Sequence, residues 1–384
     1  MNKFMLKRSF LYISVIVVLF ITGCIKETYN MKMLSKQAHL SPTLALSAVK
    51  GDISFSDVVK KSDTVVFDQN KLVILVFKKD SVVDLKLSDF TKATILKTAT
   101  IDPSSYDLNL GDVLNHISGT VKFFNPSIKF NYTNSFHDPI KISLNVSATG
   151  KSGTKTLSLA PFTLSKPNLP VQQEITASYV IDTTNSNLPS LISLLPETIN
   201  YSGTAVITSI VKGSGSENYA IGANRLTGSL EIDVPMDLSL NNLQFKDTVN
   251  NFIKNNKGDN PLDPADFQLL RIDVSAKNGF PLGATLKMSL YDSSTKTEKS
   301  TVEATKRLDP APVDGNGKAS SVTETTTSFE FTSVFFSNVN KADKIIFTVI
   351  LNTTGTPPQE VKIYSDYRIN FNAALVVNPD INFK

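Results

Sequence analysis

Apolar and polar residues alternate strictly along two stretches of the chain, and a short turn interrupts each stretch. The first stretch covers residues 128–147, with its turn at 135–139. The second covers residues 270–290 and turns at Asn278-Gly279-Phe280-Pro281. Because successive side chains of a strand point to opposite faces, a period of two predicts half-buried strands. An Asn-, Gly- and Pro-containing turn between two such strands predicts a β-hairpin.

The two hairpins belong to a longer similarity along the chain. Asn134 and Asn278 lie 144 positions apart, and each hairpin is followed by a short helical stretch, a strand and a further long strand. These segments are residues 187–195, 199–207 and 230–240 in the first copy, and 338–344, 345–351 and 367–375 in the second. Such spacing predicts a duplicated β-module of about 140 residues. The alternative is a chance similarity between two ordinary hairpins.

This pattern predicts an all-β fold made of two related β-sandwich-like modules. No convincing long amphipathic helix occurs, and 384 residues exceed what one hydrophobic core usually supports. The expected domains are a signal peptide at 1–23, a tether at 24–45, a small β-meander at 46–104, and modules at 105–250 and 251–384.

The N-terminus has the composition of an export signal. Lys3, Lys7 and Arg8 form a basic start, and residues 10–21 are almost unbroken apolar. About a dozen apolar residues are too few for a helix to cross a hydrocarbon core of about 30 Å. A basic start, a short apolar run and small residues at the end predict a signal peptide. The alternatives are an uncleaved signal anchor and an ordinary signal peptide with a chance cysteine.

The end of this leader, Ile21-Thr22-Gly23-Cys24, resembles the lipobox of bacterial lipoproteins. The resemblance implies that Cys24 is lipidated and becomes the new N-terminus, with a diacylglyceryl group and usually an N-acyl chain. Two or more acyl chains hold a protein firmly to a bilayer. No Asp follows Cys24, whereas an Asp there would imply retention at the inner membrane. The expected location is therefore the outer membrane, on either its periplasmic or its surface face.

Two further resemblances concern the source and the fold. Lys26-Glu27 is similar to the surface-export signal of Bacteroidota lipoproteins. The turns at residues 134–139 and 278–281 resemble an element of uncharacterised β-rich lipoproteins of that group. More distantly, they are similar to the strand pairs of late-embryogenesis-abundant type β-sandwiches. These resemblances imply a fold and a compartment, and they imply no active site.

Charge and cysteine content narrow the possible partners. Residues 1–23 contain three basic and no acidic residues, so their removal lowers Lys+Arg from 39 to 36 against 35 Asp+Glu. The mature net charge is then about +1 instead of +4, which gives no reason to expect nucleic-acid binding. Cys24 is the only cysteine, so no disulfide can form within the chain.

Residue types that catalyse reactions or bind zinc are sparse. His39, His116 and His137 lie far apart and form no spaced pair, and His137 is expected to be an exposed turn residue. No Gly-x-Ser-x-Gly motif occurs. Ser209 and Lys212 have a Ser-x-x-Lys spacing, but on the predicted strand they would point to opposite faces. We expect no enzymatic activity, no cofactor and no metal.

Three loops deserve comparison with known ligand motifs. The acidic loops at residues 259–266 and 314–317 could hold Ca²⁺, although Asp and Asn are also favoured as turn residues beside Gly and Pro. Gly213-Ser214-Gly215-Ser216 lacks the Gly-Lys-Ser/Thr ending of a phosphate loop and is expected to be a hairpin loop.

Aromatic content bears on carbohydrate binding, which often uses exposed aromatic rings. Trp is absent, which weakens this possibility. Five tyrosines remain available, namely Tyr29, Tyr106, Tyr201, Tyr219 and Tyr291. Most of the 23 Phe residues, for instance Phe130 and Phe371, fall at apolar positions of strands and are expected in the core.

Together these observations predict a non-enzymatic, lipid-anchored cell-envelope protein with a binding or structural role. Its partners would be the membrane, through Cys24, and an envelope protein or a lipid. Unpaired edge strands could accept a partner's strand. The alternative is a carrier of lipid or another apolar ligand in a β-walled tunnel.

Overall fold

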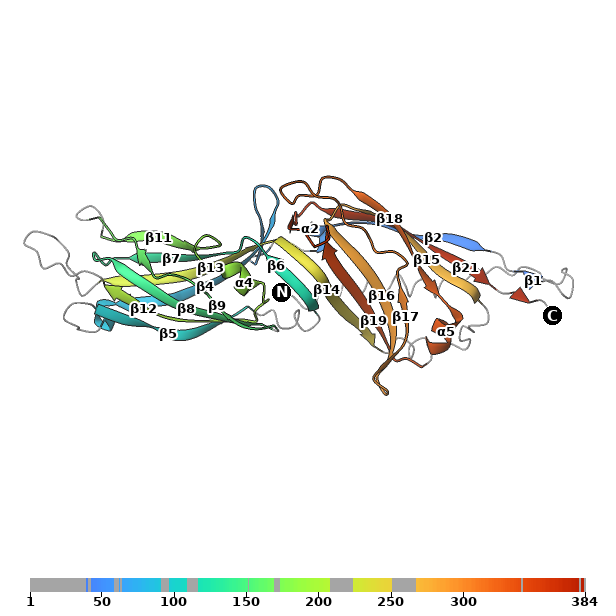
Figure 1. Cartoon of the computed structure of the whole chain (residues 1–384), viewed down its shortest axis with the longest axis horizontal. Helices are drawn as coiled ribbons and strands as arrows, with labels where there is room; N and C mark the ends of the chain where they lie inside the picture. Colours follow the sequence, from blue (N-terminus) through green and yellow to red (C-terminus); the bar gives the residue numbers. More distant parts are fainter. Residues whose placement is uncertain are drawn as a thin grey trace, which may run out of the picture. The chain divides into compact units, whose positions relative to one another are not determined.

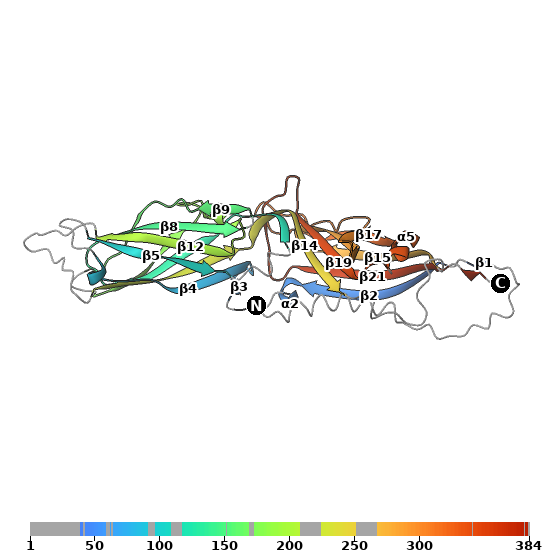
Figure 2. The same ribbon diagram turned by 90° about the horizontal axis from the view of Figure 1, so that it is seen from below.

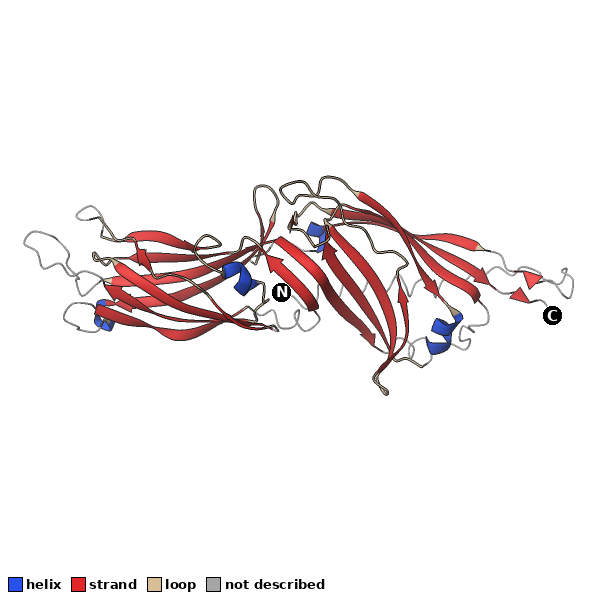
Figure 3. Cartoon of the chain, in the orientation of Figure 1, coloured by secondary structure: helices blue, strands red, loops and turns tan. Residues whose placement is uncertain are grey.

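A computed structural model of the chain shows two compact units that consist mostly of strands (Figure 3). It describes residues 39–40, 43–58, 62, 64–90, 97–108, 117–150, 152–168, 173–207, 224–250, 267–339, 341–379 and 381–382. The first sandwich is the unit of residues 61–241 and 360–365, and the second sandwich is the unit of residues 1–60, 242–359 and 366–384. The predicted all-β fold class is confirmed.

The first sandwich has two antiparallel sheets (Figures 1 and 2). One has the strand order β11-β7-β13-β4-β3, with bounds Ile175–Ile181, Ser127–Asn134, Arg225–Pro235, Val73–Lys86 and Val65–Phe67. The other has the order β10-β8-β12-β5, with bounds Phe162–Leu164, Ile140–Gly150, Thr198–Ile207 and Lys97–Asp107, and β9 (Gly153–Thr156) also pairs with β8. Two short helices belong to this unit, η2 (Leu87–Asp89) and α4 (Leu188–Ile192).

The second sandwich repeats this arrangement. One sheet has the order β18-β15-β21-β2, with bounds Thr323–Phe331, Phe267–Asn278, Arg368–Pro379 and Leu44–Ser54. The other has the order β17-β16-β19-β14, with bounds Thr297–Glu303, Leu282–Asp292, Lys344–Thr353 and Asp237–Asn250. Its helices are α2 (Phe55–Val58) and α5 (Ser333–Val339). The short strands β1 (His39–Leu40) and β22 (Ile381–Asn382) pair with each other.

The strand orders confirm the predicted duplication. β11-β7-β13-β4 corresponds to β18-β15-β21-β2, and β9-β8-β12-β5 corresponds to β17-β16-β19-β14. The strands predicted to form a hairpin are β7 and β8 in the first copy and β15 and β16 in the second, but they do not pair: β7 and β15 lie in one sheet of their sandwich and β8 and β16 in the other. The hairpin prediction is therefore wrong, because alternation shows that each strand has one buried face but not that two successive strands share a sheet. β14 begins in the first sandwich, where β6 (Ile117–Phe123) and β20 (Val361–Lys362) pair with it, and it enters the second sandwich at Asn242.

The predicted small β-meander at residues 46–104 is wrong. β2 pairs with β21 of the second sandwich, whereas β4 and β5 pair with β13 and β12 of the first. The predicted module boundaries at 105 and 250 shift for the same reason, because each sandwich needs an N-terminal strand to complete its sheet. The first sandwich is thus inserted, along the sequence, between β2 and most of β14.

Two element boundaries also differ from the prediction. The expected strand 230–240 is two strands, since β13 ends at Pro235 and the Met236 N–H donates to the carbonyl of Val73. The helix expected at 338–344 is α5, which begins at Ser333. Its start is fixed by Thr332, whose side chain accepts a hydrogen bond from the N–H of Phe335.

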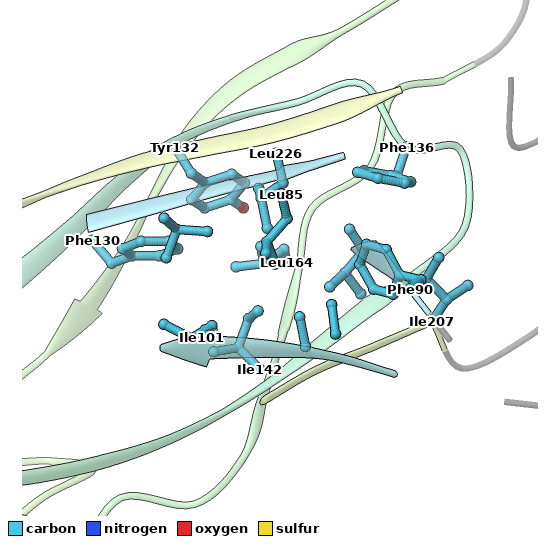
Figure 4. Packing of buried hydrophobic residues seen from close by; sticks show 14 of the residues in the cluster. Leu85, Phe90, Ile101, Phe130, Tyr132, Phe136, Ile142, Leu164, Ile207 and Leu226 are labelled. Carbon is cyan, nitrogen blue, oxygen red and sulfur yellow. The ribbon is translucent and has the colours of Figure 1, made fainter. Parts of the chain in front are cut away.

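A contiguous apolar core fills the first sandwich. Every second residue of β7 is buried, as the alternation predicts. Phe130, Tyr132, Ile142 and Leu164 point toward one another between the sheets (Figure 4). The Phe130 and Tyr132 rings stack with centroids 5.6 Å apart. Aromatic rings of this size each remove a large apolar area from water, so they dominate the packing of this core.

A buried asparagine holds the turn that leads from one sheet to the other in both copies. The Oδ1 atom of Asn134 accepts the N–H of Phe136 at 2.9 Å, and its Nδ2 donates to the carbonyl of Ser165 at 2.9 Å. Asn278 repeats both contacts: Oδ1 accepts the N–H of Phe280 at 2.9 Å and Nδ2 donates to the carbonyl of Asp309 at 2.8 Å. Each asparagine therefore joins its turn to a segment 31 residues further along the chain.

A second contact that occurs within both copies is made by an arginine on the neighbouring strand. The N–H of Ser135 donates to the carbonyl of Arg225, and the N–H of Gly279 donates to the carbonyl of Arg368. Each arginine then forms an ion pair on the next strand, Arg225 with Asp84 and Arg368 with Asp52. The same backbone and charge contacts in both units support duplication rather than chance similarity.

We predict that Asn134→Ala destabilises the protein by about 3 kcal/mol, because it leaves the N–H of Phe136 and the carbonyl of Ser165 without partners, and each such buried group costs about 1–3 kcal/mol. Denaturant unfolding measures the loss. The matched control is Asn131→Ala on the polar face of the same strand, which should change stability by less than about 0.5 kcal/mol. Equal effects of the two substitutions would contradict this role of Asn134.

Candidate functional site

Several residues singled out in the sequence lie outside the described residues. They are Cys24 with its lipobox, His116, the Ser209–Lys212 pair, the loop at 213–216 and the acidic loop at 259–266. Among the helices that the structure describes, none is long and apolar enough to span a membrane.

The prediction that His137 is exposed is wrong. His137 is only 6% exposed, and the adjacent Asp138 is also buried. The turn at 135–139 is drawn inward by Asn134 and by the fully buried Phe136, whose ring lies 5.4 Å from that of Phe90. Nδ1 of His137 has no hydrogen-bond partner within the described part of the chain. His137 is therefore a packed turn residue.

The second acidic loop is held by its own carboxylate. Oδ1 of Asp314 accepts the N–H groups of Asn316 and Lys318, each at 2.9 Å, and the N–H of Asp314 donates to the carbonyl of Lys318. This is the ordinary role of Asp in a turn, and it favours the turn interpretation over Ca²⁺ binding. Nowhere in the described ranges do three or more His, Cys, Asp or Glu side chains gather as a metal site.

A pair of carboxyl groups lies where β14 begins. Asp237 is almost completely buried, and its Oδ2 accepts a hydrogen bond from Nδ2 of Asn125 at 2.6 Å. Glu360 lies beside it, just before β20, and keeps part of its surface exposed. Burial raises the pKa of Glu360, and the negative charge of Asp237 raises it further, although Lys362 and Lys122 oppose the shift. A protonated Glu360 can then donate a hydrogen bond to Asp237.

The second sandwich leaves apolar side chains half-covered on the inner face of a sheet. On the edge strand β2, Leu44, Leu46 and Ile53 are 46%, 53% and 39% exposed. The register places them opposite Val377, Leu375 and Ile369 of β21, all half-buried. A contiguous apolar surface of this kind is characteristic of binding sites.

The partial exposure of apolar side chains on the inner face is specific to the second sandwich, as the first sandwich shows. Ile128 and Phe130 of β7 are buried, whereas Ile272 and Val274, at the equivalent positions of β15, are only half-buried. The strands of the two sheets diverge away from α2 in Figure 1. The buried cluster here is small and centres on Leu290, Phe335 and Ile345.

The outer face of one sheet of the first sandwich is hollowed. An open depression of about 540 Å³ lies over β5, β12, β8 and β9. Its polar side chains are hydroxyls and amides, and none of its lining residues is charged. We call it the hydroxyl–amide face and define it by Ser105, Asn145, Ser147, Thr156, Asn200 and Ser202.

The second sandwich has a depression of a different character. It measures about 390 Å³ and lies on the sheet that contains β2, β15 and β21. Lys50, Asp52, Lys277 and Glu324 line it, so charged groups of both signs dominate. Three of these groups are already paired, because Asp52 bonds to Arg368 at 3.2 Å and Lys277 lies 3.9 Å from Glu324.

Comparisons with known proteins identify the fold but no family. No protein-family model matches the chain, and no curated protein matches its sequence. A crystal structure of a protein from Parabacteroides distasonis, assigned as secreted, is similar with a TM-score of 0.50 and 14% identity, over 88% of this chain and 99% of that one. A structure of infectious bursal disease virus matches with a TM-score of 0.23 and 8% identity, over 80% of this chain and 42% of that one.

Neither the half-covered apolar face of the second sandwich nor the hydroxyl–amide face of the first was identified from the sequence. The alternation in β15 and β21 predicted buried residues, and nothing in it distinguishes a packed interior from an open one. The smaller side chains of the second copy are one signal: Val274 stands where the first copy has Phe130, and Ala276 where it has Tyr132. Tyr201, one of the available aromatic candidates, is buried, and Tyr106 uses its hydroxyl to bond the carbonyl of Lys78.

We predict that Glu360→Gln stabilises the protein at neutral pH but not in acid. Because the folded-state pKa of Glu360 is raised, its contribution is fully present below the unfolded-state pKa and is lost as pH rises through the folded-state pKa. Gln stays neutral and keeps a donor toward Asp237. Denaturant unfolding at about pH 3.5 and pH 7 measures the difference.

The control for this prediction is Glu174→Gln, which removes one negative charge from an exposed position of the same unit. A gain in stability that is the same at both pH values, or that Glu174→Gln reproduces, would show that the carboxyl pair is not its source.

Proposed function

We propose that this protein is a non-enzymatic lipoprotein of the bacterial outer membrane whose β-sandwiches present binding surfaces. The observation that carries the proposal is the lipobox Ile21-Thr22-Gly23-Cys24, which is followed by a duplicated all-β body.

The structural neighbour supports an extracellular or envelope location. It is assigned as a secreted protein, and its source, Parabacteroides distasonis, is one of the Bacteroidota. That is the group suggested by the resemblance of Lys26-Glu27 and of the turns at residues 134–139 and 278–281. The shared fold covers almost the whole length of that protein, so both sandwiches are part of the similarity.

The lipid on Cys24 would fix the chain to one leaflet. Burial of acyl chains contributes about 0.8 kcal/mol per CH₂ group, so two or three chains hold the protein far more firmly than one. Twenty residues separate Cys24 from Leu44 at the start of β2, which limits the distance between lipid and sandwich to about 70 Å. The anchor therefore keeps the sandwiches close to the membrane surface without a transmembrane helix.

We expect Cys24→Ala to move the protein from the membrane fraction to the soluble fraction, because the acyl chains have no other attachment site. Fractionation of cells, with immunoblotting, measures the distribution. A matched substitution inside the body, Asn131→Ala, should leave the protein in the membrane fraction. Unchanged membrane retention of the Cys24→Ala variant would contradict the lipid anchor.

A second candidate function is favoured by the half-covered apolar face of the second sandwich. Leu44, Leu46 and Ile53 lie along its edge, and an apolar ligand there would remove their surface from water at about 25 cal/mol per Å². The protein would then carry a lipid or another apolar molecule between the two sheets. This function is compatible with the anchor, since the anchor would hold the open face near a lipid source.

For this carrier function we predict that Leu46→Glu in the full-length Cys24→Ala chain at least halves the fluorescence of bound 1-anilinonaphthalene-8-sulfonate, because a hydrated carboxylate makes the face less apolar and repels the probe's sulfonate. The control is Val180→Glu on β11, an apolar residue of similar exposure on an edge strand of the first sandwich. Native mass spectrometry of the same chain should reveal co-purified lipid. Equal fluorescence of both variants, together with a lipid-free mass, would rule the carrier out.

A further inference from the structure

Cross-strand pairing assembles the hydroxyl–amide face from four strands. Ser105 of β5 pairs with Asn200 of β12, Asn200 pairs with Ser147 of β8, and Ser147 pairs with Thr156 of β9. These four side chains therefore form one row across the sheet, on the face that points away from the core. With strands about 4.8 Å apart, the row is about 14 Å long. Ser202 and Asn145, which also pair, extend the face on one side.

The hydrogen-bonding groups of this row are available. In the described part of the first sandwich, the side chains of Ser105, Asn145, Ser147, Asn200 and Ser202 form no hydrogen bond with another protein group. Elsewhere in the same unit, comparable side chains are engaged, for example Asn134, Asn185 and Asn187. The face thus presents unpaired donors and acceptors at the floor of a hollow, beside the apolar ring of Pro103.

The chemistry of the lining restricts the ligand class. Phosphate and carboxylate ligands are normally held by Lys or Arg, and none of the lining residues is charged. A protein partner would usually meet aromatic or aliphatic anchors at the centre of the interface, and this floor is made of hydroxyls and amides. Hydroxyls and amides both donate and accept hydrogen bonds, which matches a ligand covered with hydroxyl groups.

We propose that the hydroxyl–amide face binds a neutral oligosaccharide. The row of Ser105, Asn200, Ser147 and Thr156 would contact successive hydroxyl groups of the glycan, and Pro103 would pack against the apolar side of a sugar ring. This inference deepens the proposed function, on which it rests for the view that the sandwiches bind rather than catalyse. It assigns the first sandwich to glycan and leaves the apolar face of the second for a separate role.

Titration calorimetry tests the proposal on the full-length protein, purified in detergent from whichever cell fraction contains it. The probes are five uncharged oligosaccharides of glucose, mannose, xylose or N-acetylglucosamine, namely maltohexaose, laminarihexaose, mannohexaose, xylohexaose and chitohexaose. Hexagalacturonate serves as the charged comparison. At least one uncharged probe should bind with a dissociation constant of about 1 mM or tighter, and hexagalacturonate should bind at least about tenfold more weakly.

Substitutions locate the binding. The double variant Asn145→Ala/Asn200→Ala should weaken binding of the uncharged probe by about tenfold or more, because two amides that hydrogen-bond the ligand are removed. Both residues are exposed, so the fold should persist, and circular dichroism melting checks this. The matched control Asn131→Ala removes the same side chain from the outer face of the other sheet and should leave affinity unchanged.

Three results would overturn the proposal: no binding of any uncharged probe, equal affinity for hexagalacturonate, or full affinity in the folded double variant. The assay is done in detergent solution and does not depend on membrane attachment. Its failure therefore removes the glycan site alone, whereas failure of the Cys24→Ala fractionation removes the lipid anchor alone.

Discussion

A buried asparagine amide at the end of β7 or β15 fixes the frame of each sandwich. Asn134 and Asn278 each accept the N–H of a phenylalanine two residues ahead and donate to a carbonyl 31 residues further on. The first contact sets the turn, and with it the crossing of the chain from one sheet to the other. The second ties that turn to a loop distant in sequence. Because an unpaired polar group inside a core is costly, neither contact is easily replaced.

The rest of each sandwich is organised around this turn. The backbone N–H of the residue after the asparagine donates to the carbonyl of Arg225 or Arg368, which brings β13 or β21 alongside β7 or β15, and each arginine then pairs with an aspartate of the next strand. That next strand is β4 in the first sandwich and β2 in the second. The first sandwich is inserted between β2 and β14 in the sequence, so a sheet of the second sandwich is complete only when the two ends of the chain meet.

The features that the sequence predicts depend on local interactions, and those that it does not predict depend on contacts between distant residues. The strands within 128–147 and 270–290 were predicted because alternation and turn residues are local signals, and the duplication followed from their spacing. Their pairing as hairpins was wrong, since alternation does not show whether two successive strands share a sheet or lie in facing sheets. The placement of β2 was missed, since its partner β21 lies more than 300 residues away and no local pattern in residues 44–54 names it. His137 was misjudged for a similar reason, because a polar turn residue is buried only when a longer-range contact such as Asn134 to Ser165 folds the turn inward.

The same frame supports different surfaces in the two copies. Where the first copy packs Phe130 and Tyr132, the second has Val274 and Ala276, so less side-chain volume fills the space between its sheets and its apolar residues stay half-covered. The hydroxyl of Tyr132 accepts the N–H of Ser165, whereas in the second copy the hydroxyl of Tyr367 accepts the N–H of Ala319, at a different position. Duplication preserved the asparagine and arginine contacts of the turn, while the packing between the sheets changed. The first copy therefore buries a large aromatic core between its sheets, whereas the second, on the same frame, leaves the apolar side chains of β2, β15 and β21 partly exposed to water.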